Sequence, residues 1–155
     1  ALVFFAPDIS AARFRDSLAV PMAALAARRV VYASAADRML SLSRLVNHTR
    51  RAGDARAARA LAVVDVEVVD VTRGVRAEGG LRTLLDPHHA MQRAGTALYD
   101  FFGVVRGRPS ECREAEGVAT RDGERRWRLT RGAVPNRDLA CAATDHSVVT
   151  RAAPR

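Results

Sequence analysis

The sequence predicts an α/β fold with three layers, in which a parallel sheet lies between two layers of helices. Three segments of strand character, at residues 1–6, 29–34 and 63–72, alternate with segments whose apolar residues recur at helical spacing. Strands and helices in this alternation are joined by right-handed crossovers, so the strands run parallel and helices cover both faces of the sheet. The 155 residues are enough to bury one such core.

The first strand is followed by a helical region that contains a proline. Residues 1–6 form a continuous apolar run, which is typical of a strand buried on both faces. Ser10 is expected to cap a short helix after this strand. Pro21 should end that helix and occupy the first turn of another over residues 21–28, with Leu25 facing inward.

A capping pattern marks the start of the next helix. Ser34 ends the second strand and Asp37 lies three residues later, which fits a capping box in which the serine caps the helix and the acid closes the box. The helix itself is indicated by apolar residues at helical spacing, namely Met39, Leu42 and Val46.

The third strand carries acidic residues and is therefore expected near the edge of the sheet. Within residues 63–72, Asp65, Glu67 and Asp70 are interleaved with valines. Such alternation is typical of a strand with one face partly in water. A glycine-containing loop over residues 73–88 should lead from this strand to the last helix.

The last predicted helix spans residues 90–105 and completes the domain. Its apolar stripe consists of Met91, Ala94, Leu98, Phe101 and Val105. We place the domain at residues 1–107 and a tail at residues 108–155. Within the tail, residues 117–131 fit a β-hairpin around Asp122-Gly123, and the remainder is expected to be extended or disordered.

The net charge of +8 invites a nucleic-acid function, but the distribution of charge argues against it. All 25 basic residues are arginine: residues 1–105 hold 14 of them against 10 acids, and residues 106–155 hold 11 against 7, so each part carries +4. Nucleic-acid binders gather their charge on one face, and single-strand binders add aromatic residues on which bases stack. We therefore expect no nucleic-acid partner and keep a basic nucleic-acid-binding domain as a rival.

The remaining composition excludes other classes of protein. No apolar run approaches the roughly 20 residues that span a bilayer. Cys112 and Cys141 show no metal-ligand spacing; they could pair in an oxidising compartment, but two inert thiols are the simpler expectation. These features leave the compartment open between the cytoplasm and export.

Candidate catalytic residues follow the predicted strands. In a parallel sheet, chemistry is found at the C-terminal ends of the strands, which selects Asp8, Asp37 and the adjacent histidines His88 and His89. An acid after one strand and a histidine in the loop after the next is the order of an α/β-hydrolase triad, in which a serine precedes both. The imidazole would contact the serine hydroxyl with one nitrogen and the acid with the other.

Four segments, at residues 6–9 (APDI), 32–43 (YASAADRMLSLS), 51–53 (RAG) and 68–71 (VVDV), resemble an uncharacterised bacterial branch of the α/β-hydrolases. That branch is described as lipase- or esterase-like. The resemblance covers about residues 2–105, and it implies the C-terminal portion of an α/β-hydrolase fold.

The resemblance also implies roles for individual residues. Asp37 corresponds to the triad acid, and the histidine before the last helix corresponds to the base. In this family an aspartate of the last helix follows the histidine by about three turns, and Asp100 then favours His88 over its neighbour His89. Asp8 is the reserve acid, because some α/β-hydrolases take the acid from the earlier strand.

The chain has no recognisable nucleophile. None of its serines carries the flanking glycines of a Gly-x-Ser-x-Gly elbow. We therefore expect an N-terminal half of the same protein, upstream of Ala1, to supply the serine and the oxyanion hole, and we expect these 155 residues alone to be inert. The expected substrate is a small ester or similar acyl compound, and no metal or organic cofactor is needed.

A non-catalytic α/β module is the first rival interpretation. Asp37 has a sufficient role as part of a helix cap, and His88 and His89 could be solvated loop residues beside Pro87. A Gly-x-Ser-x-Gly elbow after a strand in the upstream reading frame would separate the two interpretations.

Overall fold

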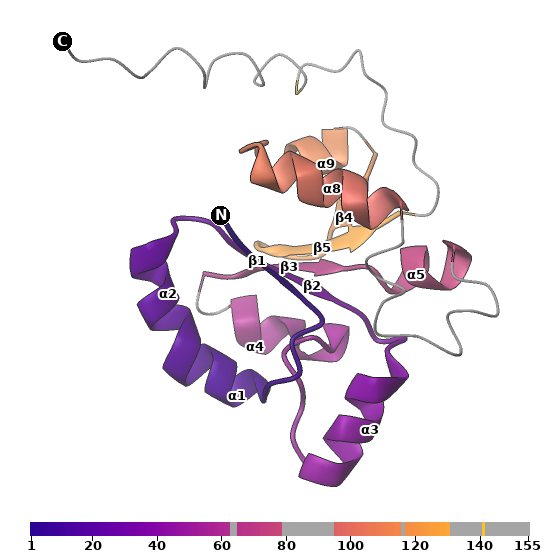
Figure 1. Cartoon of the computed structure of the whole chain (residues 1–155). Helices are drawn as coiled ribbons and strands as arrows, with labels where there is room; N and C mark the ends of the chain where they lie inside the picture. The colour runs from indigo at the N-terminus through magenta and orange to yellow at the C-terminus, as the bar shows by residue number, and fades with distance from the viewer. Residues whose placement is uncertain (63–64, 79–94, 116, 131–140, 142–155) are drawn as a thin grey trace.

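The computed structural model describes residues 1–62, 65–78, 95–115, 117–130 and 141, and these form a five-stranded sheet with the order β1-β2-β3-β5-β4 (Figure 1). Four strands are parallel, and β4 is antiparallel to β5. Their bounds are Leu2–Phe5 for β1, Arg29–Ala33 for β2, Glu67–Asp70 for β3, Ala119–Arg121 for β4 and Arg126–Leu129 for β5. The predicted α/β class with a parallel sheet is confirmed.

Helices on both faces of the sheet give the three predicted layers. One face packs against α1 (Ala11–Arg13), the π-helical segment η1 (Phe14–Ala19) and α4 (Ala58–Ala62). The other face packs against α5 (Thr72–Glu78), where a loop was predicted, and α8 (Gly95–Val105). The remaining helices are α2 (Val20–Leu25), α3 (Arg38–Asn47), the 3₁₀ turn η2 (Ala55–Ala57) and α9 (Cys112–Ala115).

Alternate residues of the strands supply two separate cores, because successive side chains of a strand point to opposite faces. Val31 and Val68 pack with Phe14 on the side of α1 and α4. On the side of α8, Val69 packs in a cluster that includes Trp127. Burial on both faces explains why the first two strands are apolar throughout their interior.

The region around Pro21 is one continuous helical run rather than two helices. Segments α1, η1 and α2 follow one another without a break. Pro21 lies in the first turn of α2, and the π-helical geometry of η1 immediately before it changes the hydrogen-bond spacing to i→i+5. This spacing rotates the following residues relative to a regular α-helix. Leu25, which we expected inside, is 77% exposed.

The third strand lies inside the sheet, not near its edge, and is shorter than predicted. β3 pairs with β2 on one side and with β5 on the other. Its acids do not need water, because Glu67 accepts hydrogen bonds from Arg28 and Arg113 and Asp70 accepts one from the Thr72 amide. Of the three alternating acids, Glu67 forms buried ion pairs, Asp70 is bonded to Thr72 at the strand end, and Asp65 lies before β3 with its side chain 54% exposed.

The buried face of α8 is rotated from the predicted stripe. Val105 belonged to that stripe and is 57% exposed. The rotation has an electrostatic cause, since Tyr32 and Arg113 both donate hydrogen bonds to the Asp100 carboxylate and hold it inside. The residues that α8 buries are Thr96, Ala97, Asp100 and Val104.

The predicted β-hairpin is present and forms part of the sheet. β4 and β5 flank a turn in which Gly123 has a φ of +124°, and β5 pairs in parallel with β3. The boundary at residue 107 stays a prediction, but the segment assigned to a tail contributes two strands. Cys112 and Cys141 form a disulfide with a Cα–Cα distance of 5.5 Å, contrary to the expected thiols. Their separation of 29 residues gave no indication of this proximity.

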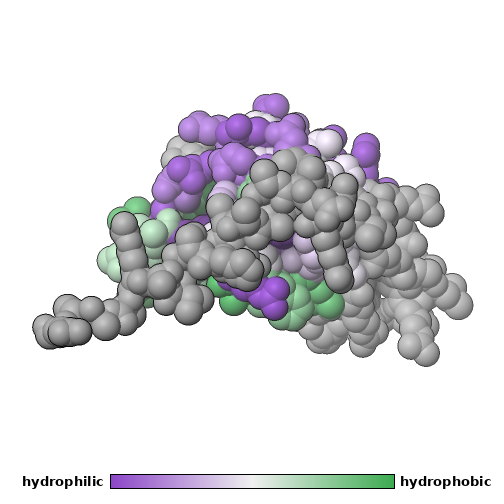
Figure 2. Space-filling view, turned by 90° about the horizontal axis from the view of Figure 1, so that it is seen from above, coloured by the Kyte–Doolittle hydropathy of each residue, from purple (hydrophilic) through white to green (hydrophobic). Residues whose placement is uncertain are grey.

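Two observations concern the surface of the protein. No helix in the described ranges is long and apolar enough to cross a bilayer. Seen from above, hydrophilic residues gather in the upper half of Figure 2, and hydrophobic residues lie at its left and along its lower margin. Residues 131–140 and 142–155 of the predicted tail lie outside the described residues.

Candidate functional site

The loops that follow β1, β2 and β3 are joined by hydrogen bonds at one edge of the sheet. The Gly53 amide donates to the Pro7 carbonyl at 3.0 Å, and the Ser34 amide donates to the Gly53 carbonyl at 2.9 Å. The Ala35 amide donates to Thr72 Oγ1 at 2.9 Å. Three loops are therefore held as one unit at the edge where parallel sheets place their chemistry.

Gly53 is expected to be intolerant of any side chain. A Cβ at this position would lie 2.5 Å from the carbonyl carbon of Ala6 and 2.8 Å from the Pro7 nitrogen, and these backbone atoms cannot move aside locally. We expect Gly53→Ala to lower the free energy of unfolding by about 1–3 kcal/mol, measured by urea denaturation. Gly74→Ala is the control: a Cβ there meets nothing within 4 Å, and alanine favours the α5 helix. Equal destabilisation by both changes would contradict this explanation.

Asp37 lies directly after β2 at this edge and is only 2% exposed. Its Oδ1 accepts hydrogen bonds from the amides of Met39 at 2.9 Å and Leu40 at 3.1 Å. Asp37 is therefore the N-cap of α3. The side chain thus lies at the helix end where acidic residues interact favourably with the helix dipole.

The capping box expected between Ser34 and Asp37 is wrong in its assignment. Ser34 Oγ accepts from the Ala36 amide at 3.1 Å, so this serine stabilises the turn before α3 and the helix cap belongs to the acid. The spacing S-x-x-D located the helix start correctly but not the residue that caps it. The Asp37 carboxylate is thus held at the start of α3 by the hydrogen bonds that it accepts from the Met39 and Leu40 amides.

Asp8, the reserve acid, is in a more open position. Its side chain is 51% exposed and forms an ion pair with Arg51 at 3.0 Å. Ser43 Oγ donates a hydrogen bond to the same carboxylate at 2.8 Å, which ties the loop after β1 to α3. These contacts give Asp8 a structural role at the edge.

The two histidines, His88 and His89, lie outside the described residues. The pairing of either with Asp37 therefore stays a prediction. No group of three or more metal-binding side chains occurs within the ranges that the structure describes.

Thr72 also lies at this edge of the sheet, although the sequence patterns did not single it out. Its amide and hydroxyl both donate to Asp70 Oδ1, and its hydroxyl oxygen accepts from the Ala35 amide. This threonine therefore joins the end of β3 to the loop that leads to Asp37. An aspartate two residues before a threonine at a strand end is a pattern for such a turn and could have indicated it.

The opposite edge of the sheet holds a buried charge network. Arg113, 1% exposed, donates to Glu67 at 2.7 Å and to Asp100 at 2.8 Å. Tyr32 donates to the other oxygen of Asp100 at 2.6 Å, and Arg28 donates to Glu67 at 2.8 Å. The network fastens α8 and α9 to the central strands.

The network shifts the pKa values of its members. Burial by itself would raise the pKa of Glu67, but hydrogen bonds from Arg28 and the charge of Arg113 outweigh it and lower this pKa to about 2. Burial would likewise lower the pKa of Arg113, and the two carboxylates raise it instead. Burial and the neighbouring Asp100 both raise the pKa of Tyr32. All three groups keep their ordinary charges at neutral pH.

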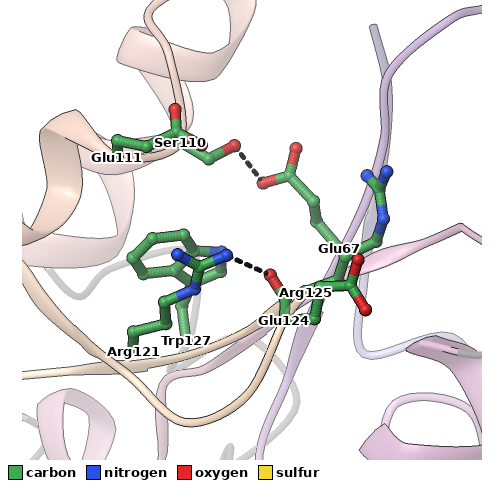
Figure 3. Close-up of a pocket in the computed structure, with 7 residues that line it drawn as sticks. All are labelled: Glu67, Ser110, Glu111, Arg121, Glu124, Arg125 and Trp127. Carbon is green, nitrogen blue, oxygen red and sulfur yellow. Dashed lines mark hydrogen bonds between the residues drawn. The ribbon is translucent and has the colours of Figure 1, made fainter.

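A small cavity of about 150 Å³ lies beside this network (Figure 3). Ser110 donates to Glu67 across one side of it, and Arg121 donates to the Glu124 carbonyl on the other. Glu67, the buried acid in its wall, is already paired with Arg28 and Arg113 and is therefore not a free general base. Its lining residues are Glu67, Ser110, Glu111, Arg121, Glu124, Arg125 and Trp127.

The fold and this edge define a parallel α/β protein that carries an acid after its second described strand. Residues 1–84 match the model of a family described as alpha/beta hydrolase of unknown function (DUF900). Because this match spans more than half of the chain, the protein belongs to that family. No curated protein and no solved structure matches the chain. The match includes Asp8, Asp37 and Gly53 and ends before His88.

Proposed function

We propose that the chain supplies the acid and the histidine of a serine-type hydrolase that cleaves esters or similar acyl compounds. The observation that carries the proposal is the place of Asp37, a buried carboxylate at the C-terminal edge of the sheet. Membership of an α/β-hydrolase family supports it. The nucleophile comes from polypeptide upstream of Ala1, because no serine of the chain has an elbow sequence.

In this proposal Asp37 orients the imidazole and stabilises its protonated form. The imidazole, from His88 or His89, accepts the proton of the serine hydroxyl and returns it to the leaving group. Hydrogen bonds from the Met39 and Leu40 amides of α3 hold the Asp37 carboxylate in one orientation. The carboxylate also lies at the positive end of the helix dipole. Asp8 is less suited to this role, since its carboxylate is paired with Arg51 and half exposed.

The test measures hydrolysis of p-nitrophenyl esters by a polypeptide in which residues 1–155 follow their natural upstream sequence. Short and long acyl chains distinguish an esterase from a lipase. We expect His88→Gln to slow hydrolysis at least about a hundredfold, as loss of a general base does, and His89→Gln to have little effect. The reverse result would assign the base to His89. Full activity in both variants would refute the proposed triad.

A further inference from the structure

Helix α3 presents an apolar stripe to the surface. The helix extends away from the sheet at the lower right of Figure 1, and Leu40 is its buried residue. Ser43, one turn further, contacts Asp8 and so faces the body of the protein. The side of α3 opposite Leu40 and Ser43 faces away from the body of the protein.

The outward side of α3 is apolar rather than polar. At 100° per residue its four exposed apolar side chains fall within an arc of roughly 120°. Single exposed apolar residues are common, whereas a contiguous set on one helix marks an interaction surface. We call this set the α3 stripe: Met39 (53% exposed), Leu42 (53%), Leu45 (69%) and Val46 (68%).

Within α3 itself the charged residues are both arginines, and the helix contains no acidic residue. Arg38 lies within the arc of the stripe and Arg50 follows after the helix ends, whereas Arg44 lies about 160° from the centre of the arc, on the opposite side of the helix. A second copy of the chain docked stripe to stripe about a two-fold axis would add a second Arg38 and a second Arg50, and no acid from its own α3 to pair with them. The charges favour an anionic partner instead.

We propose that α3 docks the protein on an anionic lipid surface. The α3 stripe enters the boundary between headgroups and acyl chains, and Arg38 contacts lipid phosphates, as in amphipathic helices that lie in the plane of a bilayer. Asp37 caps the same helix. Docking would therefore bring the candidate catalytic edge to the lipid surface, a consequence that rests on the proposed function, although docking itself does not.

The first test measures co-sedimentation of the 155-residue chain with vesicles of phosphatidylcholine, alone or with about one third phosphatidylglycerol. We expect binding to the mixed vesicles and an at least about tenfold lower partition coefficient for the double variant Leu42→Ser/Val46→Ser. Val20→Ser/Leu25→Ser on α2 is the matched control, because these side chains are 67% and 77% exposed but lie on another helix. All four positions are on the surface, so circular dichroism should show an unchanged fold.

The second test concerns the arginines. Arg38→Gln should weaken binding to the mixed vesicles about fivefold, Arg44→Gln on the opposite side of the helix should weaken it less, and added salt should weaken wild-type binding. Equal binding by wild type and the Leu42→Ser/Val46→Ser variant would overturn the proposal, as would failure to bind mixed vesicles. A dimer seen by light scattering that disappears in this variant would assign the stripe to a second copy. Vesicle binding needs no hydrolysis, so a complete polypeptide, with its natural upstream sequence, that binds vesicles but cleaves no ester would contradict the proposed function alone.

Discussion

Asp37→Asn is expected to lower kcat of the complete hydrolase by about 10⁴-fold while leaving α3 intact. Asparagine caps helices as well as aspartate does, so the bonds to the Met39 and Leu40 amides survive. The negative charge that would fix the imidazole tautomer and stabilise the imidazolium is lost, and this loss has the stated size in a serine triad. The measurement is the rate of p-nitrophenyl ester hydrolysis at saturating substrate.

The comparison with Asp37→Ala separates catalysis from capping. Alanine removes both the charge and the cap, so this variant should lose activity and also about 1 kcal/mol of stability in urea. Asp8→Asn should keep most of the activity, because Asp8 is half exposed and paired with Arg51. If Asp37→Asn retained wild-type kcat, Asp37 would be a helix cap and nothing more.

The parts of the fold that sequence predicted correctly are those set by local patterns. The apolar runs of the first two strands have no other suitable place than a buried sheet. Asp122-Gly123 specified a hairpin because glycine accepts the positive φ that the turn requires. The position of Asp37 at the edge was predicted for the same reason, since the S-x-x-D spacing after a strand marks the start of a helix, although the cap itself was assigned to Ser34.

The errors came from partners far apart in the sequence. Glu67 lies 46 residues from Arg113, so a local window sees an acid on a strand and assigns it to water. Asp100 was left outside the apolar stripe of its helix for the same reason, although Tyr32 bonds to it across 68 residues. The disulfide between Cys112 and Cys141 was not predicted for the same reason, because its two cysteines are 29 residues apart. Burial of a charge can be inferred only when its partner is known.

Arg113→Met is expected to lower the free energy of unfolding by about 3–5 kcal/mol, more than the changes at Gly53, Asp37 or Arg128. The guanidinium is the shared partner of Glu67 and Asp100, and it also lies over the Trp127 ring at 5.4 Å. Methionine fills a similar volume but removes the cation that the two buried carboxylates share, leaving Glu67 with Arg28 at 2.8 Å and Asp100 with Arg108 at 3.8 Å. Loss of this buried partner costs far more than a surface ion pair contributes. Urea denaturation at neutral pH measures the loss.

Arg128→Met is the matched control for this change. Its ion pair with Asp122 is 2.9 Å long, but the two side chains are 40% and 50% exposed, so the loss should stay below about 1 kcal/mol. Similar losses in the two variants would show that the buried network contributes no more than a surface pair. Glu67→Gln in the Arg113→Met background should restore part of the stability, since it removes one of the two buried carboxylates that lose Arg113.

The same network predicts how stability depends on pH. The pKa of Glu67 is lowered from an ordinary value of 4.5 to about 2, so its ionised form stabilises the fold fully above pH 4.5. This contribution, roughly 3 kcal/mol, is lost as the pH falls from 4.5 towards 2. In Glu67→Gln that part of the acid dependence should disappear. In Arg113→Met the pKa of Glu67 should rise, because the carboxylate keeps Arg28 but loses its buried partner. The free energy of unfolding of Arg113→Met should therefore begin to fall from its neutral-pH value at a higher pH than in wild type. If it begins to fall at the same pH in both proteins, Arg28 alone keeps Glu67 ionised.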